Sequence, residues 1–82
     1  MFSRDSHDGS SYEKAIVVTA ENEQDGVEQE YLWIEENCGG CKFVSQGLNF
    51  NENRPYDVFE LVDAQGVNRK VHFDIMSFYG KR

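Results

Sequence analysis

The chain has 82 residues, enough for one small domain with a single hydrophobic core. Its 15 acidic and 8 basic side chains give a formal net charge of −7 at pH 7, which repels nucleic-acid phosphates and anionic membrane surfaces. This charge disfavours direct nucleic-acid binding. No apolar run resembles a signal peptide or approaches membrane-spanning length, so we expect a cytoplasmic protein without membrane contact.

The first thirteen residues differ in composition from the rest of the chain. Residues 1–13 are rich in Ser, Asp and Gly and show no strand or helix periodicity, which predicts a mobile tail ahead of one domain over residues 14–82. The run Lys14–Ala20 then predicts an interior strand, because consecutive β-branched residues are typical of strands buried on both faces.

The next segment, residues 25–38, has the period of an amphipathic helix. The apolar positions that recur at spacings of four, three and four are Val27, Tyr31, Ile34 and Cys38. We expect this stripe to face the core. Asp25 is suited to accept hydrogen bonds from the first helical turn, and Gly39 and Gly40 are suited to end the helix.

Three further strands are expected at residues 42–50, 56–62 and 67–75. Asp63 and Gly66 suit a three-residue hairpin loop, and this loop places Phe59 opposite Val71 on the face that meets the helix. A register one residue shorter, which pairs Val62 with Val67, is a second candidate. In both cases the prediction is an α+β two-layer sandwich of β-α-β-β-β order. One amphipathic helix packs on a four-stranded, mostly antiparallel sheet.

The motif Cys38-Gly39-Gly40-Cys41 has the spacing of a disulfide or of half a metal site. It closes a helix instead of opening one, so the helix dipole opposes thiolate formation and thiol catalysis is disfavoured. A tetrahedral zinc site also lacks a second cysteine pair. The favoured interpretation is two reduced thiols, with Cys38 packed as a small apolar residue, and no cofactor; a metal or reversible disulfide site is the alternative.

A second candidate is the sheet face directed away from the helix, where polar side chains alternate with their neighbours. The residues that share this face in the preferred register are Tyr56, Glu60, Lys70, His72 and Asp74. Acid–base chemistry near His72 is one hypothesis, but no nucleophile or phosphate-binding loop accompanies it, so we predict no catalytic residue. A solvated face with cross-strand ion pairs is the ordinary interpretation, and a homodimer interface is another.

The third candidate is the charge segregation around the helix. No Lys or Arg occurs from Ala15 to Cys41, whereas this stretch carries a series of carboxylates. The acidic residues predicted to contact a partner are Glu21, Glu23, Asp25, Glu28, Glu35 and Glu36. Solubility alone accounts for such a series, and attraction to a basic protein surface is the functional interpretation.

These observations favour a small acidic, non-catalytic interaction module that docks on a basic partner protein or self-associates as a homodimer. One alternative is a thiol or metal-binding protein that uses Cys38 and Cys41. A second alternative is a small enzyme or ligand carrier with a site near His72. An enzyme is the less favoured class, since the sequence offers no convincing catalytic arrangement.

Overall fold

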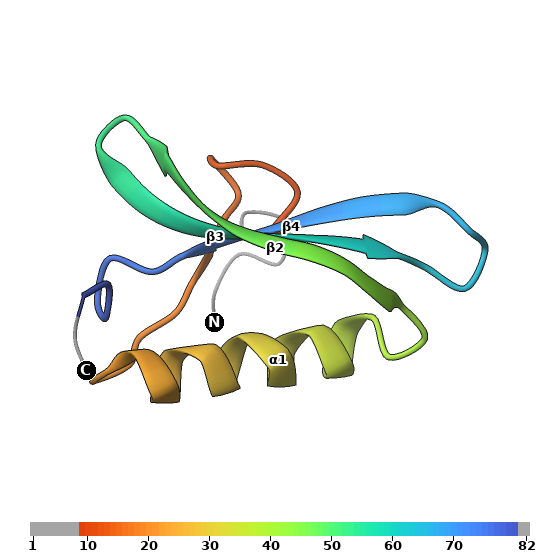
Figure 1. Cartoon of the computed structure of the whole chain (residues 1–82), viewed down its shortest axis with the longest axis horizontal. Helices are drawn as coiled ribbons and strands as arrows, with labels where there is room; N and C mark the ends of the chain where they lie inside the picture. Colours follow the sequence, from red (N-terminus) through yellow and green to blue (C-terminus); the bar gives the residue numbers. More distant parts are fainter. Residues whose placement is uncertain (1–8, 81–82) are drawn as a thin grey trace.

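The computed structural model describes residues 9–80 and shows one helix packed on one face of a four-stranded sheet (Figure 1). The elements, in chain order, are β1 (Ile16–Val17), α1 (Glu23–Asn37), β2 (Lys42–Asn51), β3 (Arg54–Val62) and β4 (Asn68–Asp74). The predicted α+β class, element order and helix-on-sheet layering are confirmed. In the described residues no helix is long and apolar enough to cross a membrane.

The sheet has the strand order β1-β4-β3-β2, with β2, β3 and β4 antiparallel and β1 parallel to β4. The two edges are therefore β1 and β2. The predicted interior strand over Lys14–Ala20 is wrong, because only Ile16 and Val17 pair with β4 and they do so at an edge. Val17 is exposed whereas Val18 is buried in the core, so only one face of the β-branched run is buried.

The β3–β4 hairpin adopts the preferred register, with Phe59 opposite Val71. Asp63 donates its backbone N–H to the carbonyl of Val67 at 3.0 Å, which closes the three-residue loop. Gly66 has φ +83°, a left-handed conformation that a side chain disfavours. Local turn chemistry therefore sets the register of this hairpin.

The β2–β3 hairpin turns more tightly than the predicted loop. Glu52 and Asn53 both have positive φ, 52° and 68°, as in a two-residue type I′ turn whose twist matches the flanking strands. Pairing therefore continues through Asn51 and Arg54. Pro55 is buried in β3 beside Phe50, although its ring removes one backbone donor from the ladder.

Helix α1 is capped by Asn22 and not by Asp25: the Asn22 Oδ1 atom accepts the backbone N–H of Asp25 at 2.9 Å. Its buried residues are Gly26, Glu30 and Ile34. In the predicted apolar stripe Ile34 is buried, whereas Tyr31 is half exposed although its ring meets the buried Phe59 edge to face. The helix is rotated because the ring of Phe78, 2% exposed, packs where Gly26 has no side chain.

Aromatic side chains fill the space between helix and sheet. Phe59 and Phe73, both 0% exposed, contact each other edge to face, and Trp33 meets Phe73 in the same geometry. The remaining buried members of the core are Val18, Ile34, Leu61, Val71, Ile75 and Phe78. The core lies under β3 and β4, so β2 extends beyond it.

The described part of the predicted tail, residues 9–13, lies against β4 and the outer face of the sheet. The carbonyl of Gly9 accepts the backbone N–H of His72 at 2.7 Å, and the Tyr12 ring contacts His72 and Tyr56. The packed structure therefore begins before residue 14. The rest of the predicted tail, residues 1–8, lies outside the described residues.

Candidate functional site

The edge strand β2 is the least covered element of the described fold. Nine of its ten residues are exposed, and one side of its backbone faces no other strand. The pairing with β3 places four β2 side chains on the same side of the sheet as the helix, and these are Phe43, Gln46, Leu48 and Phe50. Phe43, Leu48 and Phe50 remain 48%, 47% and 57% exposed, so this side of the strand is apolar and open.

The helix contributes a matching exposed side. Tyr31 and Leu32 are exposed, and Tyr31 reaches β2: its hydroxyl donates to Gln46 Oε1 at 3.3 Å and its ring meets Phe43. Glu28 and Glu35 lie one turn before and after on the same helix side. All four helix residues line a shallow hollow of about 560 Å³ that ends at Cys38, Gly39 and Cys41.

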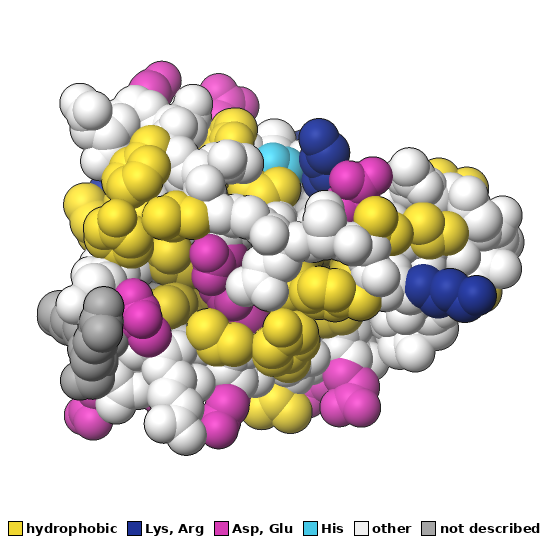
Figure 2. All heavy atoms as spheres, viewed as in Figure 1, with side chains coloured by type: hydrophobic (Ala, Val, Ile, Leu, Met, Phe, Trp, Pro, Cys, Tyr) yellow, Lys and Arg dark blue, Asp and Glu magenta, His cyan; other side chains and the backbone are white. Residues whose placement is uncertain are grey.

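We call this region the α1–β2 surface and define it by two sets of side chains. The helix provides Glu28, Tyr31, Leu32 and Glu35, and the strand provides Phe43, Leu48 and Phe50. Figure 2 shows acidic side chains flanked by hydrophobic ones on this side of the molecule. The surface is therefore mixed, with apolar area and negative charge together.

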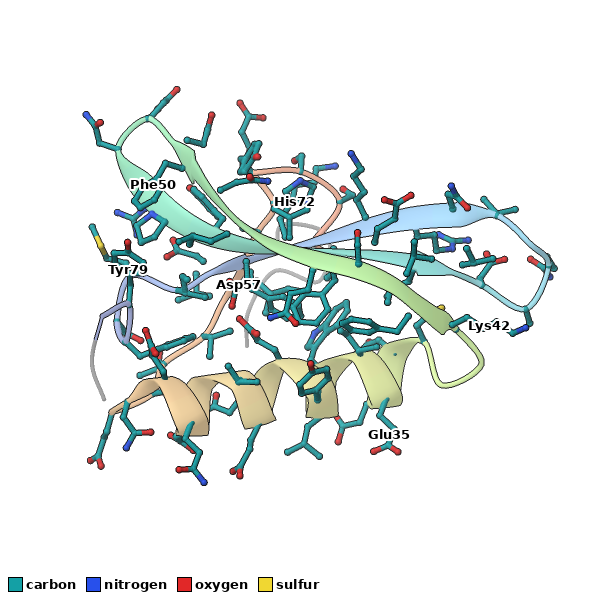
Figure 3. The ribbon with its side chains drawn as sticks, viewed as in Figure 1. Glu35, Lys42, Phe50, Asp57, His72 and Tyr79 are labelled. Atoms are coloured by element: carbon teal, nitrogen blue, oxygen red, sulfur yellow. A yellow bond between two sulfur atoms is a disulfide. The ribbon has the colours of Figure 1, made fainter. Side chains whose placement is uncertain are left out.

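Two carboxyl groups meet behind this surface, Glu30 of α1 and Asp57 of β3. Asp57 pairs with Leu48 across the strands and points from the sheet toward the helix (Figure 3). Glu30 is 0% exposed, and with both groups ionised neither of its carboxylate oxygens has a hydrogen-bond partner. A proton on either carboxyl group turns their contact into a hydrogen bond.

Burial raises the pKa of Glu30 to about 9, and the hydrogen bond and negative charge of Asp57 act in the same direction. Burial is the largest cause. The two ion pairs among residues 9–80, Arg54–Asp74 and Arg69–Asp63, leave this carboxyl pair without a cation. At neutral pH Glu30 therefore carries a proton.

The acidic residues predicted to bind a partner are divided by the structure. Glu28 and Glu35 lie on the α1–β2 surface. Glu23 instead accepts the backbone N–H of Gly80 at 3.2 Å, and Asp25 accepts from Gln29 at 3.3 Å. The whole predicted set of Glu21, Glu23, Asp25, Glu28, Glu35 and Glu36 lies outside the core, and two of its members, Glu28 and Glu35, line the hollow beside Tyr31 and Leu32.

Cys38 and Cys41 are joined as a disulfide, with their Cα atoms 5.4 Å apart. The expectation of two reduced thiols therefore differs from the structure. The spacing by two glycines brings the Cα atoms within the usual range for a disulfide. Residues 9–80 contain no group of three His, Cys, Asp or Glu side chains placed to hold a metal ion.

The polar sheet face is largely covered by the chain itself. Tyr56, His72 and Asp74 are all less than 10% exposed, and His72 Nδ1 lies 2.8 Å from the carbonyl of Gly9. The prediction of a solvated face is wrong there, because Tyr12 packs over it. Glu60 and Lys70 are opposite each other as predicted, yet Glu60 contacts Asn68 at 3.4 Å and forms no ion pair with Lys70.

A signal for the carboxyl pair is present in the sequence, although the predicted sites did not include it. Asp57 lies two residues before Phe59, which was expected to face the helix, so both side chains lie on the same face of the strand. Glu30 precedes Ile34 by four residues, so it lies one turn away on the same helix face. An acidic residue at each position indicates two carboxyl groups between the layers.

No protein-family model matches the chain, and no curated protein or solved structure is significantly similar to it.

Proposed function

We propose that this protein is a small non-catalytic interaction module that binds an extended basic segment of a partner protein along β2. The observation that carries the proposal is the open edge of β2, a ten-residue strand with half-exposed apolar side chains on its helix-facing side. An unpaired strand edge offers backbone donors and acceptors to an incoming strand, and alternate side chains enter the adjacent groove.

Natural proteins protect exposed edges with charges, prolines or irregularities that prevent unwanted pairing. On β2 the only charged residue is Lys42, at the start of the strand, and the register shift between Phe43 and Ser45 leaves the rest regular. Proline is absent from β2. The edge is thus open to a strand from outside.

Charge determines which partner suits this edge. The chain carries −7 at pH 7, and Glu28 and Glu35 border the exposed Tyr31 and Leu32. A basic segment is attracted to this surface, whereas a second copy of the chain brings the same negative charge. We therefore favour a basic partner over the homodimer.

The two alternatives have less support. A thiol function is less supported because Cys38 and Cys41 are bonded to each other at the end of α1. A site near His72 is less supported because the Tyr12 ring packs over its imidazole ring. The α1–β2 surface instead combines exposed apolar area, charge and free backbone groups.

The test is selection from a phage-displayed library of random 12-residue peptides, followed by titration of synthetic binders. We expect the selected peptides to be enriched in Lys or Arg alternating with apolar residues, and to bind more weakly at high salt. Leu48→Arg should abolish binding, because it replaces an apolar contact with a charge that repels the basic segment. The matched control is Asn49→Arg, which adds the same charge one residue away on the opposite side of β2.

The proposal fails if no peptide is enriched over an unrelated bait, or if both variants weaken binding equally. Sedimentation equilibrium of the free protein provides the other control. We expect a monomer at about 100 μM, a concentration well above the Kd of specific complexes. A dimer that Leu48→Arg dissociates would replace the basic partner with a second copy of the chain.

A further inference from the structure

We propose that the Glu30–Asp57 pair binds the side-chain cation of one lysine or arginine from the partner segment. This inference rests on the proposed function of the α1–β2 surface and adds the residue that the partner must supply. It assigns a specificity-determining role to two carboxyl groups that belong to different layers of the fold.

The first support is that the ionised form of Glu30 has no partner in the free protein. Its side chain is 0% exposed, and with both carboxyl groups ionised its two oxygens have no hydrogen-bond donor among the described residues, so only a retained proton joins Glu30 to Asp57. Burying a carboxylate without hydrogen-bond donors costs free energy, so an apolar residue at this position would make the free protein more stable. A lysine or arginine cation supplies both the donors and the opposite charge.

The second support is the position of the pair along the edge strand. Asp57 pairs with Leu48, near the middle of β2, and is itself only partly buried. A cation that enters beside Leu48 therefore meets Asp57 first and Glu30 behind it. The aliphatic stem of lysine or arginine suits the apolar approach past Leu48.

The third support is the pair's apolar flanks. Phe50 and Tyr79 contact each other toward the β2–β3 turn, and Tyr31 contacts Phe43 toward the start of β2. Same-face residues of a strand recur about every 6–7 Å. The recognised segment should therefore carry a basic residue with apolar residues two positions before and after it.

Cation binding by the pair is coupled to release of a proton, whereas a pair with a purely structural role releases none when the peptide binds. The charged group that faces Glu30 from the sheet is Asp57, and the helix-facing side of β2 carries no charged residue. The free pair holds one proton at neutral pH, and an incoming cation favours the ionised pair. The proton leaves to solvent when the cation binds.

The experiment is a double-mutant cycle with a selected peptide that contains one lysine. Its partner peptide has norleucine at that position, which keeps the aliphatic chain and removes the charge. Both are titrated calorimetrically at pH 7 into the wild-type protein, into Glu30→Gln and into Asp57→Asn. Glu21→Gln is the matched control, because it removes an exposed carboxylate that lies outside the α1–β2 surface.

We expect norleucine to weaken binding to the wild type and to Glu21→Gln by roughly tenfold or more, and to change binding to Glu30→Gln and Asp57→Asn much less. Titrations in buffers of different ionisation enthalpy should show release of about one proton by the wild type and almost none by Glu30→Gln.

Each other outcome overturns the inference in a recognisable way. Equal norleucine effects on wild type and both site variants, with peptide binding intact, would reject the cation site and leave the interaction module standing. Absence of any peptide whose binding is weakened by Leu48→Arg would reject both the cation site and the interaction module. Either isosteric variant suffices, so the misfolding of one, visible in its amide NMR spectrum, leaves the other to decide.

Discussion

Glu30 on α1 and Asp57 on β3 bring two carboxyl groups together between the helix and the sheet, with Glu30 fully buried. Two adjacent carboxyl groups between these layers cannot both ionise without a large cost in free energy, so the pair retains one proton. The acidic character of this protein therefore has an interior component as well as an exposed one.

The first prediction concerns the pH dependence of stability. The pKa of Glu30 rises from its ordinary 4.5 to about 9 on folding, so the folded state binds more protons than the unfolded state between these values. The stabilisation that this group contributes to the folded state is fully present below pH 4.5 and decreases as the pH rises to about 9. At pH 7 the loss is on the order of 3 kcal/mol.

Glu30→Gln removes this loss, because the amide stays neutral and can still donate to Asp57. Urea unfolding should show the variant more stable than the wild type by up to about 3 kcal/mol at pH 7, and nearly equal to it at about pH 4.5. Glu28→Gln should change stability by less than about 0.5 kcal/mol. A pH-independent difference for Glu30→Gln would contradict a buried proton.

The second prediction separates the causes of the Glu30 shift. Asp57→Asn removes the neighbouring negative charge but leaves the burial, which is the largest cause. The pKa of Glu30, measured from its carboxyl carbon resonance, should therefore fall below 9 and stay above 4.5. An unchanged pKa would mean that Asp57 does not act on Glu30, and a return to 4.5 would mean that Glu30 is not buried.

The parts of the fold that were predictable are those set by neighbours in the chain. The loop from Asp63 to Gly66 determines its own hairpin register, and the helix and strand periods predicted the right element order. The rotation of α1 was not predictable from apolar spacing. It depends on Phe78 meeting Gly26, a contact between residues that are far apart in the chain.

The candidate site was not predictable for a similar reason. Whether β2 is covered depends on how much of the sheet one helix spans, and the core lies under β3 and β4. Glu30 shares a helix face with Ile34, but its sequence position does not determine which strand residue it meets. Only the contact of two layers shows that it pairs with Asp57.

The third prediction tests the rotation of α1. Gly26→Ala adds a methyl group where the Phe78 ring lies, so overpacking of about 1–3 kcal/mol should exceed the helix-propensity gain of about 1 kcal/mol. Urea unfolding should show net destabilisation. Gln24→Ala, at an exposed position in the same turn, should not destabilise the protein. If Gly26→Ala stabilises the protein, the Phe78 ring does not occupy the space beside Gly26.

The fourth prediction concerns the bond between Cys38 and Cys41, whose sequence separation of 3 makes a very short loop. Chain entropy gives about 2 kcal/mol for so short a loop. Dithiothreitol should lower the unfolding free energy by that amount and leave the far-ultraviolet spectrum unchanged. The Cys38→Ser/Cys41→Ser variant should match the reduced protein and be insensitive to dithiothreitol. A wild type equally insensitive would show that the thiols are free in solution.

The fifth prediction uses Asp63, whose pH effect has the opposite sign from that of Glu30. Hydrogen bonds from the backbone N–H of Val67 and from Arg69 lower the pKa of Asp63 below its ordinary 3.8. This stabilisation is present above pH 3.8 and is lost as pH falls through the folded-state pKa.

At pH 7 Asp63→Ala should be less stable than Asp63→Asn, because asparagine can still accept the loop N–H groups of Gln65 and Val67. Both should be less stable than the wild type, which alone retains the ion pair with Arg69. The advantage of the wild type over Asp63→Asn should shrink in unfolding curves measured at successively lower pH below 3.8, as the carboxyl group becomes protonated. If that advantage persists in acid, charge does not hold this loop, and the shape of the turn alone sets the hairpin register.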